Sequence, residues 1–103
     1  MFRIHAVIVT PLAESDLQGI YAYHAADSGP VADLVYGELY KSILSLGQLP
    51  QRFQLAKDRR LRRQGIRSVA VVSYRIYYIV EERAVRILCV WHLARRMPRH
   101  RLK

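Results

Sequence analysis

The spacing of apolar residues predicts a strand followed at once by a helix. Residues 2–9, "FRIHAVIV", are rich in apolar and β-branched side chains and are typical of a strand. Thr10 can cap a helix and Pro11 suits the first helical position, so the helix should begin there. The residues that then share one helical face are Ala13, Leu17, Ile20, Tyr21 and His24.

A second helix is predicted to begin at Pro30, directly after a turn in "DSGP". Gly47 suits its C-terminus, and Pro50 prevents the helix from continuing. Two helices joined by so short a turn form an antiparallel hairpin. The apolar stripe of the second helix contains Ala32, Val35, Tyr36, Leu39, Ile43 and Leu46.

Three strand-like runs follow a basic connector at 51–65 that shows little periodicity. These runs span residues 66–72, 74–80 and 85–91. The gap at 81–84 is short enough for a hairpin, so the last two runs should pair antiparallel. The β-α-α-β-β-β order predicts an α+β fold, in which the N-terminal helical hairpin packs on one face of a small, mainly antiparallel sheet.

Side chains alternate between the two faces of a strand, and strict alternation predicts where the arginines of this sheet lie. The simplest arrangement buries the residue sets without arginine under the two helices. In the last strand these sets include Cys89 and Trp91, in phase with Val85 and Ile87. The other face would then be uncovered, basic and partly aromatic. It is predicted to carry Arg67, Arg75, Arg86 and His92.

Length and composition limit the class of protein. With 103 residues, 51% of them hydrophobic, the chain suits a single domain over residues 1–103 with a packed core. It has no apolar run of the ~18 residues that a membrane span needs, and its N-terminal apolar stretch is too short for a signal peptide. We therefore expect a cytoplasmic protein that contacts no membrane, with a mobile basic tail at 96–103.

The charge is uneven along the chain. The net charge is +9, but residues 1–50 hold two of the 17 basic and five of the eight acidic residues, and residues 51–103 hold the rest. So basic a second half indicates an acidic partner, either nucleic acid, including ribosomal RNA, or an acidic protein. The arginine run of the connector could also be a solvated loop. The candidate nucleic-acid or target contacts are Arg59, Arg60, Arg62, Arg63, Arg86 and Arg96.

Two motifs near the C-terminus, "YRIYYIV" and "VRILCVWHLAR", follow the opening "TPLAESDL", the hairpin end "LGQLPQRF" and the strand "GIRSV". In this order the chain resembles the RelE/ParE toxin superfamily of type II toxin–antitoxin modules over nearly its whole length. The resemblance implies a RelE/ParE-like fold and one of two activities. RelE-like members cut mRNA on the ribosome, and ParE-like members poison DNA gyrase.

If the chain is RelE-like, the resemblance implies that Arg75 stabilises phosphate charge and that His92 acts as an acid or base. Arg67 and Arg95 would add positive charge. The sequence departs from this branch, because it lacks the lysines that some ribonuclease members carry on the second strand, and arginine cannot act as a base. Its connector has one acid, Asp58, and no tyrosine lies near the C-terminus.

The ending "VWHLAR" resembles the H-x-x-R ending common in ParE-like members, and together with the missing lysines it favours that branch. The resulting interpretation is a growth-inhibiting toxin of the plasmid-stabilisation kind that acts on DNA gyrase and has no enzymatic activity of its own. A ribosome-dependent mRNA endoribonuclease is the alternative. A degenerate or purely nucleic-acid-binding member is the second alternative.

A toxin of either branch implies a cognate antitoxin, which would be small, acidic and encoded by a neighbouring gene. Operator DNA would be bound only through this antitoxin. The uncovered sheet face is the expected dock for an acidic amphipathic helix or an added strand. The residues expected to contact the antitoxin are Tyr77, Ile79, Leu88, Val90 and Trp91.

Structural roles compete with these functions at two positions. Arg75 could face solvent and pair with Glu81 or Glu82, and His92 could cap the end of its strand. No cofactor is expected. A metal site is not expected either, because the histidines are not spaced as ligands with one another or with the single cysteine, Cys89.

Overall fold

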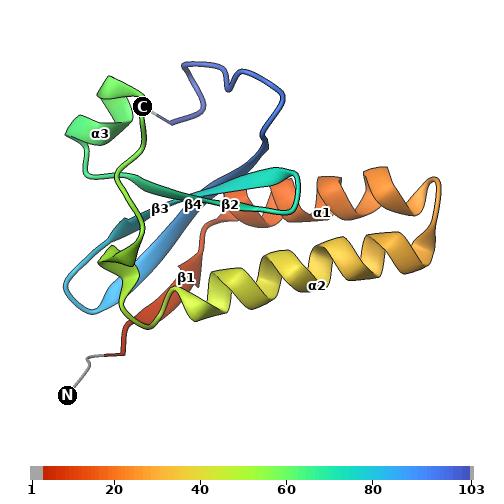
Figure 1. Cartoon of the computed structure of the whole chain (residues 1–103), viewed down its shortest axis with the longest axis horizontal. Helices are drawn as coiled ribbons and strands as arrows, with labels where there is room; N and C mark the ends of the chain where they lie inside the picture. The colour runs from red at the N-terminus through yellow and green to blue at the C-terminus, as the bar shows by residue number, and fades with distance from the viewer. Residues whose placement is uncertain (1–3, 103) are drawn as a thin grey trace.

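A computed structural model describes residues 4–102. Its elements are β1 (Ala6–Val9), α1 (Pro11–Ala25), α2 (Gly29–Ser45), the 3₁₀ turn η1 (Pro50–Arg52), α3 (Arg59–Arg63), β2 (Arg67–Val71), β3 (Tyr74–Val80) and β4 (Ala84–His92). The helices α1 and α2 run side by side and pack on a four-stranded sheet (Figure 1). This arrangement confirms the predicted α+β fold and the order of its long elements.

The sheet has the strand order β1-β4-β3-β2. The pairs β2–β3 and β3–β4 are antiparallel, whereas β1 lies parallel to β4 at the edge. β1 is shorter than predicted, because Ile4 makes only an isolated bridge to Gln48, and residues 2 and 3 lie outside the described part of the chain. β4 is therefore an inner strand that contacts both the first and the third strand of the sequence.

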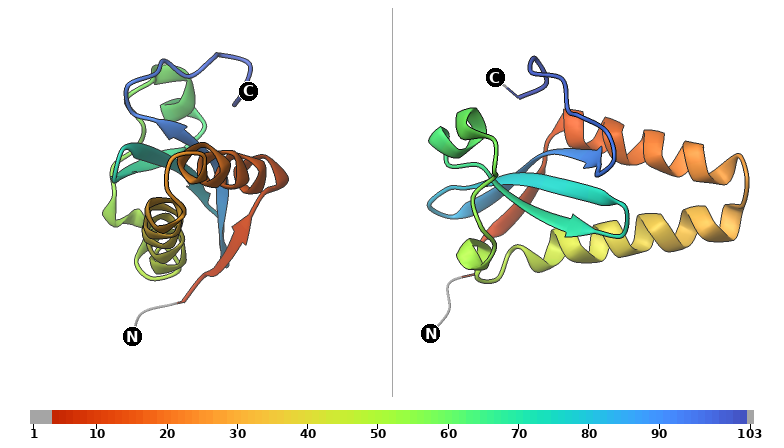
Figure 2. Two further views of the ribbon diagram at one scale, coloured as in Figure 1. Left: turned by 90° about the vertical axis from the view of Figure 1, so that its right-hand side faces the viewer. Right: turned by 45° about the horizontal axis from the view of Figure 1, so that its top comes forward.

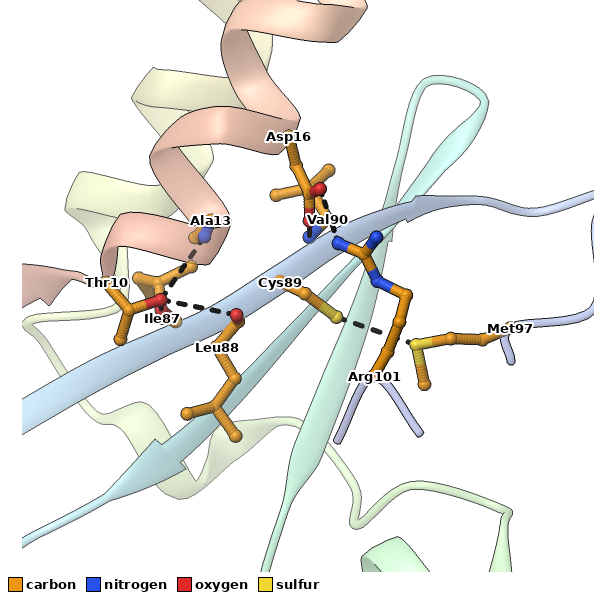
Figure 3. Close-up of polar contacts among 9 residues, drawn as sticks. All are labelled: Thr10, Ala13, Asp16, Ile87, Leu88, Cys89, Val90, Met97 and Arg101. Atoms are coloured by element: carbon orange, nitrogen blue, oxygen red, sulfur yellow. Dashed lines mark hydrogen bonds and ion pairs between the residues drawn. The ribbon is translucent and has the colours of Figure 1, made fainter. Parts of the chain in front are cut away.

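The first long helix begins where the sequence predicts. Thr10 accepts a hydrogen bond from the Ala13 amide through its side-chain oxygen, and Pro11 occupies the first turn. The same hydroxyl donates to the Ile87 carbonyl at 2.7 Å, which fixes the start of α1 to β4 (Figure 3). The second helix begins one residue before Pro30 and is capped by Ser28.

The main core lies between the two long helices and the sheet. On the predicted stripes, Tyr21 is exposed and its hydroxyl donates to Asp33, while His24 is half-buried and contacts Tyr74. The other stripe residues of α1 are buried. The buried members of this core are Ala13, Leu17, Ile20, Val35, Leu39, Ile43, Leu46, Tyr74, Ile76, Tyr78, Val85, Ile87 and Val90.

A second, smaller core covers part of the face of the sheet that faces away from the helices. The connector contributes to it through α3, which is capped by Asp58 and anchored by the buried side chain of Leu61. The connector has no apolar periodicity that would have predicted this helix. The second core consists of Ala56, Leu61, Ile66, Cys89 and Leu102.

The C-terminal segment packs against the fold, which differs from the expected mobile tail. Leu102 is buried in the second core, and Met97 contacts the Cys89 thiol (Figure 3). Arg101 forms an ion pair with Asp16 of α1. Figure 2 shows this segment and α3 together on the side of the molecule away from α2. The uncovered sheet face predicted from alternation is therefore partly occupied by the chain itself.

A β-bulge in β4 overturns part of the predicted side-chain alternation. Tyr78 pairs with Ile87, but Tyr77 pairs with Cys89, so Leu88 is an extra residue in the strand. As a result Ile87 packs in the main core and Cys89, two positions later, packs in the second core. The prediction that Cys89 and Trp91 lie under the helices is therefore wrong.

The same bulge returns Val90 and His92 to the helix side, opposite Ile76 and Tyr74 in the register. Arg67 is also on that side, because it pairs with Tyr78, and its guanidinium donates to the Phe53 carbonyl at 2.6 Å. The four residues predicted to share one face are thus divided. Arg75 and Arg86 lie on the outer face, and Arg67 and His92 lie on the helix side.

Candidate functional site

An open cleft of about 520 Å³ lies between α1 and the C-terminal end of β4. Helix α1 contributes one wall and the last residues of β4, with the turn after them, contribute the other. The side chains with polar groups or aromatic rings in its lining include Asp16, Tyr23, Tyr74, Trp91, His92 and Arg95.

A row of rings runs along the cleft from α1 to the end of β4. The rings of Tyr23 and His24 meet edge-on with their centres 5.2 Å apart. His24 Nε2 lies 2.9 Å from the Tyr74 hydroxyl oxygen. Tyr74 in turn meets the His92 ring edge-on at 5.3 Å. Burial raises the pKa of Tyr74, with Tyr23 adding to the rise and Arg95 opposing it, so the hydroxyl is protonated at neutral pH.

His92 closes the turn that follows β4. Its Nδ1 accepts a hydrogen bond from the Ala94 amide at 3.0 Å, so a neutral His92 carries its proton on Nε2. This geometry is the capping role that competes with catalysis at this position. Arg95 is exposed at the cleft, and its carbonyl accepts from Trp91 Nε1 at 3.1 Å. His92 and Arg95 are therefore the two candidate catalytic residues that the fold brings together.

The other two candidate catalytic residues lie elsewhere. Arg75 is on the outer face of β3, opposite Trp91 in the register, and its guanidinium donates to the Ser68 hydroxyl at 3.3 Å. It pairs with neither of the glutamates considered from the sequence, since Glu81 pairs with Arg86 instead. The Arg67 guanidinium donates to the carbonyls of Gln51 and Phe53. Arg67 pairs with Tyr78, which is four positions along β3 from Tyr74 in the cleft.

Asp16 and Arg101 are the polar pair that sequence reasoning missed. Asp16 Oδ2 accepts from the Val90 amide at 3.0 Å, and Oδ1 accepts from the guanidinium of Arg101 (Figure 3). The Cζ atom of Arg101 also lies over the Trp91 ring. With both oxygens occupied by donors, the carboxylate serves to fix α1, β4 and the C-terminal segment. No local pattern could have revealed it, because the two residues are 85 positions apart.

The candidate antitoxin contacts are less accessible than predicted. Val90 is 2% exposed and belongs to the main core, so it cannot contact a partner in this fold. Tyr77 and Leu88 pack against the second core, and Trp91 lies under Arg101. Ile79 is half-buried near the β3–β4 turn. The connector and the C-terminal segment therefore cover much of the sheet face over these residues, and their contact with an antitoxin stays a prediction.

The candidate basic contacts also differ in how they are held. Arg62 is turned back onto the carbonyls of Ala56 and Lys57, and Arg86 forms an exposed ion pair with Glu81 at 3.4 Å. Arg60 donates to the Arg99 carbonyl. The remaining candidates are exposed side chains without an ion pair in the described chain, namely Arg59, Arg63 and Arg96.

Cysteine and metal chemistry find little support in residues 4–102. Burial raises the pKa of the Cys89 thiol to about 12, and the nearby Asp16 carboxylate adds to the rise, so the thiolate nucleophile is scarce at neutral pH. Within the same residues, no group of three or more His, Cys, Asp or Glu side chains is placed to hold a metal ion.

No helix in the described range, residues 4–102, is long and apolar enough to cross a membrane.

Comparisons with known proteins agree with this architecture. The family model described as the ParE toxin of type II toxin–antitoxin system, parDE, matches residues 7–97. A search of curated proteins gives no match. Among solved structures, a chain of the chromosomal ParDE TA system from P. aeruginosa superposes with a TM-score of 0.75 at 17% identity, over 87% of this chain and 97% of that one. At this identity the structural match concerns the fold alone.

Proposed function

The chain belongs to the ParE toxin family of type II toxin–antitoxin systems, and from this we propose that it inhibits DNA gyrase and is held inactive by a cognate antitoxin. The antitoxin would be a small acidic protein encoded beside the toxin and would carry any operator DNA binding. Its acidity would complement the basic second half of this chain.

The observation that carries the gyrase proposal is the separation of the residues that RNA cleavage would require. Cleavage by attack of a ribose 2′-hydroxyl needs a proton acceptor, a proton donor and cations around one phosphate. His92 lies on the helix side of the sheet and Arg75 on the outer face, which argues against both acting on one phosphate. Arg67 is occupied by backbone carbonyls, four positions along β3 from the cleft.

The cleft between α1 and β4 is the surface that we assign to gyrase. It presents the exposed ring of Tyr23 and the exposed guanidinium of Arg95 beside His92. Aromatic residues and arginine are enriched at protein interfaces and contribute much of their binding energy. The contact of His24 Nε2 with the Tyr74 hydroxyl at 2.9 Å joins α1 to β3 beside this surface.

The test is a pair of assays on the purified protein. We expect it to inhibit DNA supercoiling by gyrase, and we expect intact mRNA in a translating extract. Unchanged supercoiling together with cut mRNA would reject the gyrase proposal in favour of the ribonuclease alternative. Loss of both activities would instead indicate a degenerate member.

The antitoxin is tested separately. Co-expression with the product of the neighbouring gene should restore growth, and the two proteins should purify together. Failure of every neighbouring gene to relieve toxicity would reject this part of the proposal and leave the gyrase assay unaffected.

A further inference from the structure

A second open cleft, of about 360 Å³, lies where α3 meets the C-terminal segment. Its lining consists of Asp58, Arg59, Arg60, Arg63 and Arg99. The proposed contact with gyrase does not use this cleft, which is formed on the opposite side of the sheet from the main core. We propose that it binds the sugar-phosphate backbone of duplex DNA.

The positive charge of this cleft is not neutralised within residues 4–102. The ion pairs in that range join Arg86 to Glu81 and Arg101 to Asp16, so the four arginines of the cleft take part in neither. Asp58 is the one acid in the lining, and its Oδ1 accepts from the amides of Arg60 and Leu61 at 2.8 and 3.2 Å. The cleft therefore presents a net positive charge that an anionic ligand could neutralise.

The fold holds the arginines close together at an electrostatic cost. Arg59 and Arg63 are four positions apart on α3, and like charges at this spacing destabilise a helix. The helix is nevertheless fixed, because Leu61 is buried in the second core. The Arg60 guanidinium donates to the Arg99 carbonyl at 2.7 Å, which brings the C-terminal segment and its arginine to the cleft. An anion bound between these groups would relieve their repulsion.

The side-chain chemistry points to phosphate. All four cations are arginines, whose planar guanidinium groups bind phosphate oxygens in pairs. No aromatic or apolar side chain lines the cleft, so unpaired bases would find no ring to stack on, as single-stranded nucleic acid requires. An acidic amphipathic helix would equally find no apolar contact there. A duplex presents phosphates outside and keeps its bases stacked inside, which matches a cleft that offers charge alone.

Binding of this kind is independent of base sequence and depends strongly on salt. Because the Arg60 guanidinium donates to the Arg99 carbonyl, we count phosphate contacts only from Arg59, Arg63 and Arg99. Three such contacts give a slope of about −2.7 for the logarithm of the binding constant against that of the salt concentration. Affinity should therefore fall roughly 40-fold between 50 and 200 mM salt. A toxin that binds DNA in this way would be concentrated on the substrate of the enzyme that we propose it inhibits.

The experiment measures fluorescence anisotropy of a labelled 20-base-pair DNA duplex with the purified full chain and needs no gyrase, so its outcome is separate from that of the gyrase assay. The variant Arg59→Gln/Arg63→Gln should flatten the salt slope by about 1.8 and leave the affinity equal for unrelated duplex sequences. The matched control, Arg83→Gln/Arg86→Gln, removes the same charge from the β3–β4 hairpin, where Arg83 is exposed and Arg86, in β4, pairs with Glu81. Its slope should stay close to that of the unchanged protein.

Three results would overturn the proposal. Equal losses in the two double variants would mean that binding follows net charge and not this cleft. Tighter binding of single-stranded RNA than of the duplex, or of a poly-glutamate peptide at 150 mM salt, would assign the arginines to another ligand. If the Arg59/Arg63 variant does not fold, Arg99→Gln serves instead, because it keeps the backbone carbonyl that Arg60 uses. This single variant should flatten the slope by about 0.9.

Discussion

Arg101 joins the C-terminal segment to α1 by donating to Asp16, and its guanidinium lies 4.5 Å from the centre of the Trp91 ring. The two charged side chains are 18% and 12% exposed. We predict that Arg101→Ala lowers the free energy of unfolding by about 2 kcal/mol, because Asp16 would lose its cation in a largely buried place. Urea denaturation at pH 7 measures this change.

Arg99 provides the matched control for that prediction. It is an exposed arginine of the same segment, and its side chain makes no hydrogen bond or ion pair in the described residues. Arg99→Ala should therefore change stability by less than about 0.5 kcal/mol. Equal effects at positions 99 and 101 would show that the ion pair contributes nothing of its own.

Two glycines, one inside α2 and one just after its end, should respond in opposite directions to alanine. A Cβ on Gly47 would lie 2.8 Å from the His5 carbonyl oxygen, so Gly47→Ala must separate the end of α2 from the chain entering β1, at a cost of about 1–3 kcal/mol. Gly37 lies inside α2 with open space around its Cβ position, so Gly37→Ala should stabilise by about 0.5–1 kcal/mol. Thermal unfolding of both variants checks the signs, and a stabilising Gly47→Ala would contradict the close approach.

Alkaline pH should destabilise the fold through two buried acids. Burial raises the pKa of Tyr78 to about 12 from 10.0, against the opposing charge of Arg67, and raises that of Cys89 to about 12 from 9.0. Because the folded protein holds these protons more tightly than the unfolded chain, their contribution is complete below about pH 9 and is lost as the pH rises to about 12.

The test is the slope of stability against pH between 9 and 12. Tyr78→Phe should lose about 1 kcal/mol at neutral pH with its 2.7 Å hydrogen bond to the Pro50 carbonyl. Between pH 9 and 12 the free energy of unfolding of Tyr78→Phe should fall by about 2–3 kcal/mol less than that of the unchanged protein, since one titrating group is gone. Parallel slopes for Tyr78→Phe, Cys89→Ala and the unchanged protein would refute the assignment.

Arginine variants on the two sides of the sheet should differ in their effect on gyrase inhibition. If the cleft between α1 and β4 contacts gyrase, Arg95→Ala should raise the concentration for half inhibition roughly tenfold, the usual effect of removing one important interface side chain. Arg75→Ala is the matched arginine variant on the outer face and should leave this concentration within about twofold. If Arg75→Ala raised this concentration more than Arg95→Ala did, gyrase would contact the outer face of the sheet and not the cleft between α1 and β4.

The sequence predicted those features that depend on neighbouring residues. The start of α1 follows from Thr10 and Pro11, which satisfy and fix the first helical turn regardless of the rest of the fold. The β3–β4 hairpin follows from two apolar runs and the short gap between them. Such features need no knowledge of what packs where, and they were sufficient to indicate the α+β class and the family resemblance.

The features that escaped prediction depend on distant contacts. The helix α3 has one apolar residue, Leu61, and becomes a helix because that residue enters the second core. The C-terminal segment looked mobile because its charges are basic, yet one of them meets Asp16 at the other end of the sequence. Leu88 resembles any other apolar strand residue, so nothing local marks it as the bulge that divides the candidate site.

The bulge at Leu88 also means that β4 is one residue longer than its pairing needs. An in-frame deletion of the Leu88 codon would leave Ile87 opposite Tyr78 and Cys89 opposite Tyr77, so every later residue would keep its partner. Codon deletions inside an inner strand normally disrupt register, but this one would keep the register and straighten the strand, with loss of the Leu88 side chain from the edge of the second core. Relatives whose last strand is one residue shorter can therefore hold the same histidine in the same place, and an alignment to this chain should open its gap at position 88.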